Sequence, residues 1–366
     1  FCSDSAREDF SKRIKKRERH EGVNIVRVSN FGKLHGSIFS RIIFALSFFS
    51  KTLIYCLLNT YKYDKILLTT NPPFLGIVPL IINLITRTPY VFIAYDIFPQ
   101  IAVKLGVIKE NSFINKMWSF INVFIYNNAE KVVVIGEDMR EIILKEMKIK
   151  NSNKLELIYN WSDKTSLINI PRENNLFIKK HNIIDKKILM YSGTFGKTHN
   201  IENILEASLD LKNRKEYLFV FVGGGSKKRI IEEFILINQC KNILLAPYQP
   251  FEYLSHSLSS ADLSFVCLDS KFTGFSVPSK TYGLMALGIP IIGLLDNKSE
   301  IGKTILKYNC GKLWNKNYPK KLSDIITETL EDKKILKEMG VNGYKAFEKN
   351  FDLTIAATKY LKLLNR

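Results

Sequence analysis

The sequence predicts an α/β protein of two Rossmann-like domains that face each other across a cleft, each with a parallel sheet. Three observations favour this fold class. The 366 residues exceed what one ordinary hydrophobic core accommodates. Short, continuous apolar runs alternate with helical patterns, which is typical of parallel strands buried on both faces. The alternation pauses at a polar, Asn-rich passage around residues 164–185 and then restarts, so we expect a linker there.

The first half carries five predicted strands. The run KILLTTNPP (65–73) is apolar until two prolines stop it. In KVVVIGEDM (131–139), Glu137 and Asp138 follow the strand and open the next helix at its positive end. The other predicted strands are 22–30, 89–100 and 154–163, and the predicted helices are 38–58, 75–86 and 112–128.

The second half repeats the pattern and ends in helices. Its predicted strands are 186–196, 217–226, 242–250, 261–269 and 289–295, and its predicted helices are 200–213, 227–238, 251–260, 319–342 and 344–364. We therefore divide the chain into residues 1–165, 166–343 and a final helix, 344–366. The sequence begins FCSDSARED, with no initiator Met and no signal-peptide pattern. We expect the first domain to be truncated at its start.

Composition limits the partners and the chemistry. The net charge of +19 is spread along the chain, which favours anionic partners or reflects a lysine-rich proteome; both interpretations stay open. Five scattered cysteines without a C-x-x-C pair indicate a reducing compartment. No D-x-D or H-x-x-x-H pattern occurs, so no metal site is expected. No basic stripe is interleaved with aromatics, so nucleic acid is not an expected partner.

One segment raises a membrane question. Residues 41–62 are strongly apolar, but Lys51 interrupts them before the roughly 20 residues that a bilayer span requires. We expect a helix that is buried or lies against lipid headgroups, and a buried core helix is the favoured interpretation.

Three glycine-containing loops follow strands of the second half. They are YSGTFGKTHN with Gly193, Gly196 and Lys197, FVGGGSKKR with Gly223 to Gly225, and SVPSKTYG with Lys280. Glycines let a ligand approach backbone N–H groups, helix N-termini add partial positive charge, and lysines add full charges. Each loop alone is more often a tight turn. Together they predict a diphosphate site, while the absence of a P-loop and of G-x-G-x-x-G argues against ATPases and dehydrogenases.

These motifs, with TTNPPFLGIVPLI, YDIFPQIAVKLGVI, IYNWSD and VPSKTYGLMALGIPII, resemble a GT-B glycosyltransferase of family 4 of the bacterial surface-polysaccharide type, over nearly everything from residue 22. The resemblance implies an N-terminal acceptor domain, a C-terminal nucleotide-sugar donor domain and a last helix that crosses back. It implies retaining, metal-independent transfer of a hexosyl or N-acetylhexosaminyl group, with no cofactor besides the donor, expected to be a UDP-sugar. The acceptor is expected to be lipid-linked or a polysaccharide, as in capsule or O-antigen synthesis.

The resemblance also implies roles for residues. Lys197 and Lys280 would stabilise the leaving diphosphate, and Asp96 would face the reacting sugar unless it is only a turn cap. The implied donor-binding residues are Gly193, Thr194, Gly196, Gly223, Gly224, Tyr248, Ser279 and Thr281. The protein would work in the cytoplasm, peripherally on the inner face of the cell membrane.

The chain departs from the family at several positions. Phe275 and Gly283 stand where many members carry paired glutamates, Gln100 replaces a Glu and Tyr95 replaces a His. A catalytically degenerate partner subunit, which binds nucleotide or membrane without turnover, therefore stays open. A GT-B epimerase would need carboxylates and His in the donor cleft, which the motifs do not offer.

Overall fold

The computed structural model describes residues 2–3, 15–31 and 38–365. The expected truncation concerns the start of the chain, where residues 1 and 4–14 lie outside this description. The chain forms two compact units: residues 1–99, 108–134 and 143–156 make the first, and residues 100–107, 135–142 and 157–366 make the second. The predicted return of the last helix to the first domain stays a prediction.

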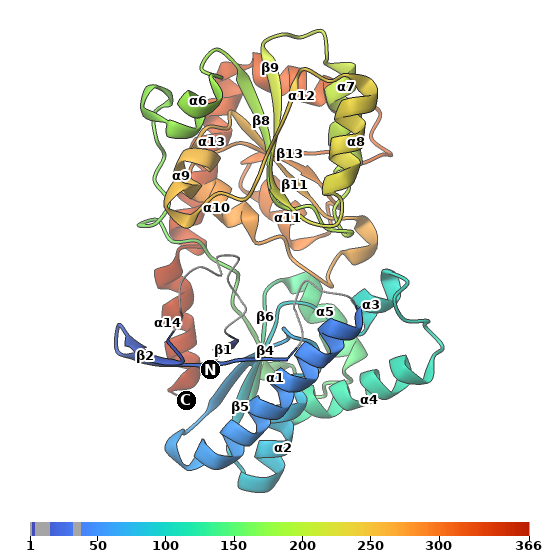
Figure 1. Cartoon of the computed structure of the whole chain (residues 1–366), viewed down its shortest axis with the longest axis vertical. Helices are drawn as coiled ribbons and strands as arrows, with labels where there is room; N and C mark the ends of the chain where they lie inside the picture. The colour runs from blue at the N-terminus through green and yellow to red at the C-terminus, as the bar shows by residue number, and fades with distance from the viewer. Residues whose placement is uncertain (1, 4–14, 32–37, 366) are drawn as a thin grey trace. The chain divides into compact units, whose positions relative to one another are not determined.

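The first unit contains two sheets (Figure 1). A small sheet has the order β1-β3-β2, in which β2 and β3 form a hairpin around Glu21 and Gly22, both with positive φ. The main sheet has the order β4-β5-β6-β7, parallel where β5 pairs with β4 and β6. The strands are β1 (Cys2–Ser3), β2 (Arg17–His20), β3 (Val23–Val28), β4 (Ile66–Thr69), β5 (Tyr90–Ala94), β6 (Lys131–Val134) and β7 (Leu155–Leu157).

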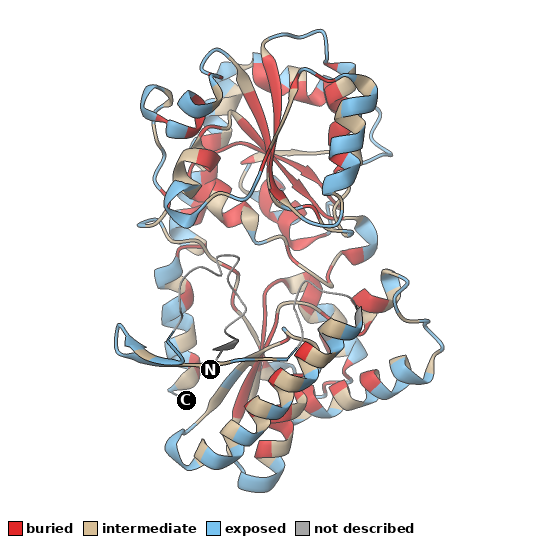
Figure 2. Ribbon diagram, in the orientation of Figure 1, coloured by how far each residue is buried: buried red, intermediate tan, exposed pale blue. Residues whose placement is uncertain are grey.

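The helices up to residue 146 are α1 (Ile38–Asn59), α2 (Ile77–Thr86), α3 (Gln100–Lys104), α4 (Phe113–Asn128) and α5 (Glu137–Glu146). Ser112 caps α4 by accepting a hydrogen bond from the Asn115 N–H. In the main sheet β5 is buried along its whole length, as its uninterrupted apolar sequence predicts (Figure 2).

Helix α1 is apolar on both faces. Phe44 and Phe48 are buried, and Phe48 packs with Leu75, Val78 and Ile82 at and before α2. The opposite face exposes Phe39, Ile42, Leu46, Ile54 and Leu58, each by more than half. The favoured prediction of a buried core helix is therefore wrong for this outer face. By length and composition alone, 42–62 could cross a bilayer, with a mean hydropathy of 1.7 and 17% of the tested window buried.

The second unit is built on one parallel sheet with the order β10-β9-β8-β11-β12-β13. Taken along the chain this is the Rossmann order 3-2-1-4-5-6, so the order reverses between β8 and β11. The strands are β8 (Lys187–Thr194), β9 (Tyr217–Gly224), β10 (Ile243–Ala246), β11 (Leu263–Cys267), β12 (Ile291–Leu294) and β13 (Gly311–Leu313). The central strands are almost entirely buried (Figure 2), which confirms the predicted α/β class.

The helices of this unit are α6 (Leu176–His181), α7 (Glu202–Asp210), α8 (Lys228–Asn238), α9 (Leu254–Ser259), α10 (Lys280–Ala286), α11 (Glu300–Lys307), α12 (Leu322–Glu331), α13 (Lys333–Asn350) and α14 (Leu353–Leu364). The predicted break at residue 343 is wrong. The chain breaks instead at Asp332, whose carboxylate caps α13, and again at Asp352, which caps α14. Gly343 lies inside α13, where an added Cβ would be 3.3 Å from that of Cys310.

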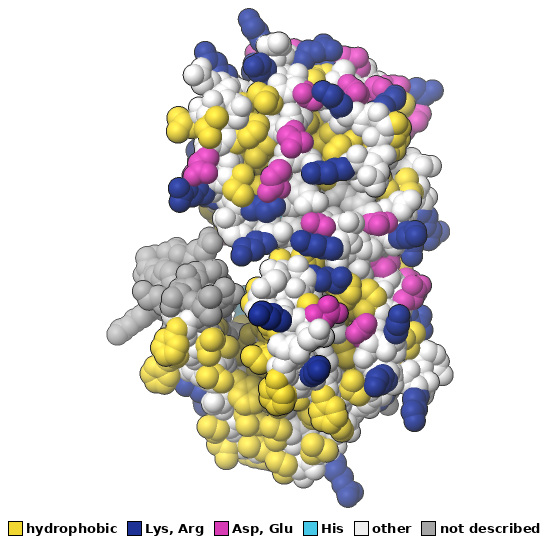
Figure 3. Space-filling view, turned by 90° about the vertical axis from the view of Figure 1, so that its right-hand side faces the viewer, with side chains coloured by type: hydrophobic (Ala, Val, Ile, Leu, Met, Phe, Trp, Pro, Cys, Tyr) yellow, Lys and Arg dark blue, Asp and Glu magenta, His cyan; other side chains and the backbone are white. Residues whose placement is uncertain are grey.

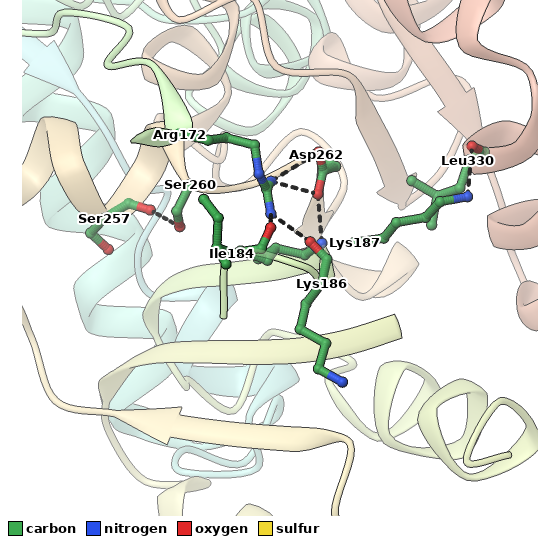
Figure 4. Close-up of polar contacts among 9 residues, drawn as sticks. Arg172, Ile184, Lys186, Lys187, Ser257, Ser260, Asp262 and Leu330 are labelled. Carbon is green, nitrogen blue, oxygen red and sulfur yellow. Dashed lines mark hydrogen bonds and ion pairs between the residues drawn. The ribbon is translucent and has the colours of Figure 1, made fainter. Parts of the chain in front are cut away.

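The Arg172 side chain connects the linker to the end of the sheet at which the strands begin (Figure 4). Both Asp262 carboxylate oxygens lie within 3.2 Å of Nη1 of Arg172, whose Nη2 donates to the carbonyls of Ile184 (2.9 Å) and Lys186 (2.6 Å). Asp262 also accepts from the Ile188 N–H at 2.7 Å. The guanidinium thus joins the linker to the starts of β8 and β11.

We expect Arg172→Met to lower the unfolding free energy by about 1–3 kcal/mol, because the half-buried Asp262 carboxylate loses its ion pair and two carbonyls lose the guanidinium donor. Urea unfolding followed by tryptophan fluorescence measures this. Arg214→Met is the matched control, since its pairs with Glu216 and Glu331 are about half exposed and should contribute no more than about 1 kcal/mol. Equal losses in both variants would contradict this role for Arg172.

Candidate functional site

A buried ammonium group lies at the start of α10. Lys280 Nζ has no acceptor in the part of the chain that the structure describes, and it lies 3.6 Å from the centroid of the Tyr191 ring. A Cβ added at Gly193, near the end of β8, would be 3.4 Å from this nitrogen, so the missing side chain lets the strand end lie close to the cation. Burial lowers the Lys280 pKa to about 8. The arrangement leaves a positive charge that an anion would satisfy.

His199 lies beside this lysine and was not singled out from the sequence. Its Nδ1 is 2.9 Å from the Thr194 carbonyl oxygen and 3.0 Å from the Tyr191 hydroxyl. Because a carbonyl only accepts, Nδ1 carries the hydrogen and Nε2 is left as an acceptor. Burial, and then the charge of Lys280, lower the His199 pKa to about 4. The imidazole is therefore neutral near pH 7. The sequence could have pointed to His199 by its position, because it lies six residues after Gly193 and shortly before a helix begins.

The predicted glycines divide by what they contact. A Cβ at Gly223 would lie 2.0 Å from the Gly193 carbonyl oxygen, and one at Gly225 would lie 2.8 Å from that of Phe195. These two glycines therefore let strand ends approach each other. At Gly196 a Cβ would be 3.4 Å from His199 Nδ1. Gly193, with φ of +121°, is the one of these that lies against Lys280.

Tyr248 covers the end of β9. Its hydroxyl is within 3.0 Å of Thr194 Oγ1 and 3.1 Å of the Gly224 carbonyl oxygen, and its ring lies 3.2 Å from where a Gly224 Cβ would be. The structure thus brings together three of the predicted donor-binding residues. Tyr248 keeps 42% of its surface exposed, so its outer face is open to a ligand.

The remaining predicted residues lie elsewhere. Lys197 is exposed and lines a polar cavity whose lining does not include Lys280. Thr281 is fully buried and its hydroxyl donates to the Pro278 carbonyl, which gives it a structural partner, whereas Ser279 is exposed. Asp96 follows β5 in the first unit, where its N–H donates to Thr70 Oγ1 at 3.2 Å.

Two helix starts of the second unit cap each other. Asp138, in the first turn of α5, accepts a hydrogen bond from the Glu300 N–H at 3.0 Å. The Glu300 carboxylate in turn accepts from the Glu137 N–H at 2.8 Å. A Cβ at Gly136 would lie 3.0 Å from that of Glu300, so the glycine makes room for this contact. Glu137 and Asp138 thus lie in the first turn of α5, as predicted, and the Asp138 carboxylate caps the start of the other helix, α11.

Comparison with known families identifies the second unit. Residues 173–346 match the family described as Glycosyl transferases group 1. The match covers β8 to β13 and includes Gly193, Tyr248 and Lys280. Residues 173–346 form a group 1 glycosyltransferase domain.

Named relatives of this glycosyltransferase domain agree. The chain is 31% identical over 270 residues to the probable glycosyltransferase WbjE of Pseudomonas aeruginosa, which covers 73% of this chain and 66% of that protein. It is 27% identical over 119 residues to the putative colanic acid biosynthesis glycosyl transferase WcaI of Escherichia coli K12, covering 32% of this chain and 29% of that protein. The chain thus spans about two thirds or less of the curated relatives it matches.

Solved glycosyltransferases share the fold. HepE of Anabaena, crystallised with UDP, superposes with a TM-score of 0.70 at 14% identity, covering 93% of this chain and 85% of that chain. Sucrose-phosphate synthase of Thermosynechococcus elongatus gives 0.77 at 17% identity, covering 96% and 85%. At these identities the likeness concerns the fold, which is confirmed as α/β of the GT-B type.

Phe275 and Gly283 stand at the two positions where glutamates were expected, and the structure shows which residues surround them. Lys104 Nζ lies 4.6 Å from the centroid of the Phe275 ring. A Cβ at Gly283 would be 3.3 Å from Leu167 Cδ1, so a longer side chain would press on the linker. Among the described residues no group of three or more His, Cys, Asp or Glu could hold a metal. Metal independence stays a prediction.

Proposed function

We propose that the protein transfers a sugar from a nucleotide diphosphate donor, a UDP-sugar, to a lipid-linked or polysaccharide acceptor in cell-surface polysaccharide biosynthesis. The group 1 glycosyltransferase domain and the names of WbjE and WcaI support the reaction and its setting. HepE structures hold UDP and UDP-glucose, which supports this donor class. We further propose that transfer retains the anomeric configuration and needs no metal or resident cofactor.

The observation that carries the proposal is the unpartnered ammonium of Lys280 against Gly193. As the bond between the sugar and the diphosphate breaks, negative charge grows on the leaving diphosphate. A cation fixed before the reaction stabilises that charge more than it stabilises the ground state. Because Lys280 has no acceptor among the residues that the structure describes, this interaction displaces no ion pair seen there.

A degenerate subunit is the second candidate. It rests on Phe275 and Gly283 at the expected glutamate positions, and the similarity to named glycosyltransferases does not favour it. Both candidates bind nucleotide, so only turnover separates them. The full-length protein should first be titrated with UDP, GDP and dTDP by calorimetry. It should then be incubated with radiolabelled UDP-sugars and membrane lipid extracts. Labelled lipid supports the transferase; tight UDP binding without transfer to any extract supports the degenerate subunit.

We also propose that the first unit lies on the anionic inner face of the cell membrane. Two apolar stripes are exposed on it, the outer face of α1 and the stripe Phe113, Met117, Phe120 and Phe124 of α4. Figure 3 shows hydrophobic side chains gathered over this unit. With a net charge of +19 on the chain, apolar burial and attraction to anionic lipid act together.

The triple variant Phe39→Ser, Leu46→Ser, Leu58→Ser should reduce sedimentation with phosphatidylglycerol vesicles at least tenfold, since three exposed side chains stop partitioning. Its thermal midpoint should be unchanged. Phe48 is buried and unsuitable for this test. The control is Leu236→Ser, Ile237→Ser, which removes side chains 78% and 77% exposed on the second unit. A similar drop in both variants would speak against a membrane face on α1.

A further inference from the structure

A polar cavity of about 760 Å³ lies at the carboxyl edge of the second sheet. Its walls come from the segments that follow β8, β11, β12 and β13. In open α/β sheets ligands bind at this edge where the strand order reverses, and here it reverses between β8 and β11. The volume falls in the range of small-molecule sites, and every lining residue belongs to the second unit.

Three acidic side chains line the cavity, and two of them pair with lysines. Glu202 pairs with Lys227 at 2.7 Å. Asp269 accepts from the Lys271 N–H at 3.1 Å and lies 3.7 Å from the Lys271 ammonium. These contacts pair both carboxylates with two of the cavity's lysines. The third acidic residue, Asp296, accepts a hydrogen bond from the Lys298 N–H at 2.8 Å and has no ion pair among the described residues.

Two other lysines keep their charge unpaired. Lys197 and Lys316 are exposed at the cavity and have no acidic partner among the residues that the structure describes. Within the same described part of the chain, the side-chain amides of Asn200 and Asn297 make no protein hydrogen bond, and Trp314 supplies an aromatic wall. Each amide can donate and accept, which matches hydroxyl groups. The four lysines of the cavity outnumber its three carboxylates, so it offers a net positive charge beside paired donors and acceptors.

We propose that this cavity binds an acidic saccharide, with a uronic acid carboxylate at Lys197 and Lys316 and sugar hydroxyls at Asn200 and Asn297. The site is separate from the nucleotide site at Lys280, which does not line it. It assigns Lys197 to saccharide rather than to the donor diphosphate. The proposal does not rest on the transferase reaction.

The test is calorimetry on the full chain saturated with UDP. The ligand is a tetrasaccharide of alternating glucuronic acid and N-acetylglucosamine, and the neutral N-acetylglucosamine tetrasaccharide is the comparison. We expect saturable binding of the acidic ligand, at least tenfold tighter than the neutral one. Lys316→Ala and Asn297→Ala should each weaken it about fivefold or more while the affinity for UDP stays unchanged.

Lys333→Ala removes the same charge from an exposed position outside the cavity and should leave binding unchanged. Four results would overturn the proposal: no saturable binding, equal binding of the neutral tetrasaccharide, equal losses in Lys316→Ala and Lys333→Ala, or binding of the acidic ligand that is seen only when UDP is left out.

Discussion

Lys280→Met should weaken UDP binding ten- to a hundredfold and at the same time raise the unfolding free energy by about 1–3 kcal/mol. The affinity falls because the diphosphate loses a charge-assisted contact. The stability rises because an ammonium without an acceptor is replaced by an apolar side chain of similar length against Tyr191 and Gly193. Calorimetric titration with UDP and urea unfolding measure the two effects.

Lys227→Met is the matched control. Lys227 donates to Glu202 and to the His199 carbonyl at 2.7 Å, so its replacement should lower the unfolding free energy instead. A purely structural Lys280 would behave as Lys227 does, with a loss of stability and unchanged UDP affinity. That result would remove the main support for the donor site.

Affinity for UDP should also fall as the pH rises from 7 to 9. Burial lowers the Lys280 pKa from 10.5 to about 8, so the folded protein loses this proton within that range. Binding an anion needs the proton. Unfolded chains keep it until about pH 10.5, so the destabilisation of the fold by the buried charge fades above pH 8. Lys280→Met should lack both trends. An equal pH slope in the variant would assign the trend to UDP itself.

Gly223→Ala should lower the unfolding free energy by at least about 3 kcal/mol. Its φ is +142°, and the added Cβ would stand 2.0 Å from the Gly193 carbonyl oxygen, a backbone atom that cannot rotate away. Urea unfolding measures the loss, and weakened UDP binding should accompany it, because the loop against Lys280 must shift.

Gly106→Ala is the control that distinguishes a steric clash of the added Cβ from the strain of a positive φ. Gly106 also has a positive φ, +71°, but nothing lies within 4 Å of an added Cβ. We expect a loss of about 1 kcal/mol there. Similar losses at both positions would show that the close approach of β8 and β9 is not what requires glycine at 223.

The long apolar strands could be predicted because burial on both faces of the sheet requires an uninterrupted run of apolar residues in the sequence. The strand β13 and the helix α11 were missed: β13 has three residues, and α11 follows a polar loop. Gly343 suggested a helix end, yet it lies within α13 as a close-packing position. A glycine can be required because a neighbouring atom lies too close for a side chain or because the backbone has a positive φ. The sequence alone does not distinguish these two reasons.

The candidate site was predictable in its loops but not in its contacts. The Gly193 and Lys280 segments, 87 residues apart, meet because β8 and β11 are neighbours in the sheet. The roles of Lys197, Thr281 and His199 depend on side-chain direction, which residue spacing does not fix. Thr281 turns inward, and His199 gains its partners only through the fold.

The mutual capping of Asp138 and Glu300 has a consequence for recombining this protein with its relatives. A hybrid joined after residue 156 would import position 138 from one parent and keep Glu300 from the other. The carboxylate from each parent would then have to cap a helix that comes from the other parent. A side chain at position 136 would keep the starts of α5 and α11 apart. Such hybrids should fold only when the residues at positions 136, 138 and 300 come from the same parent.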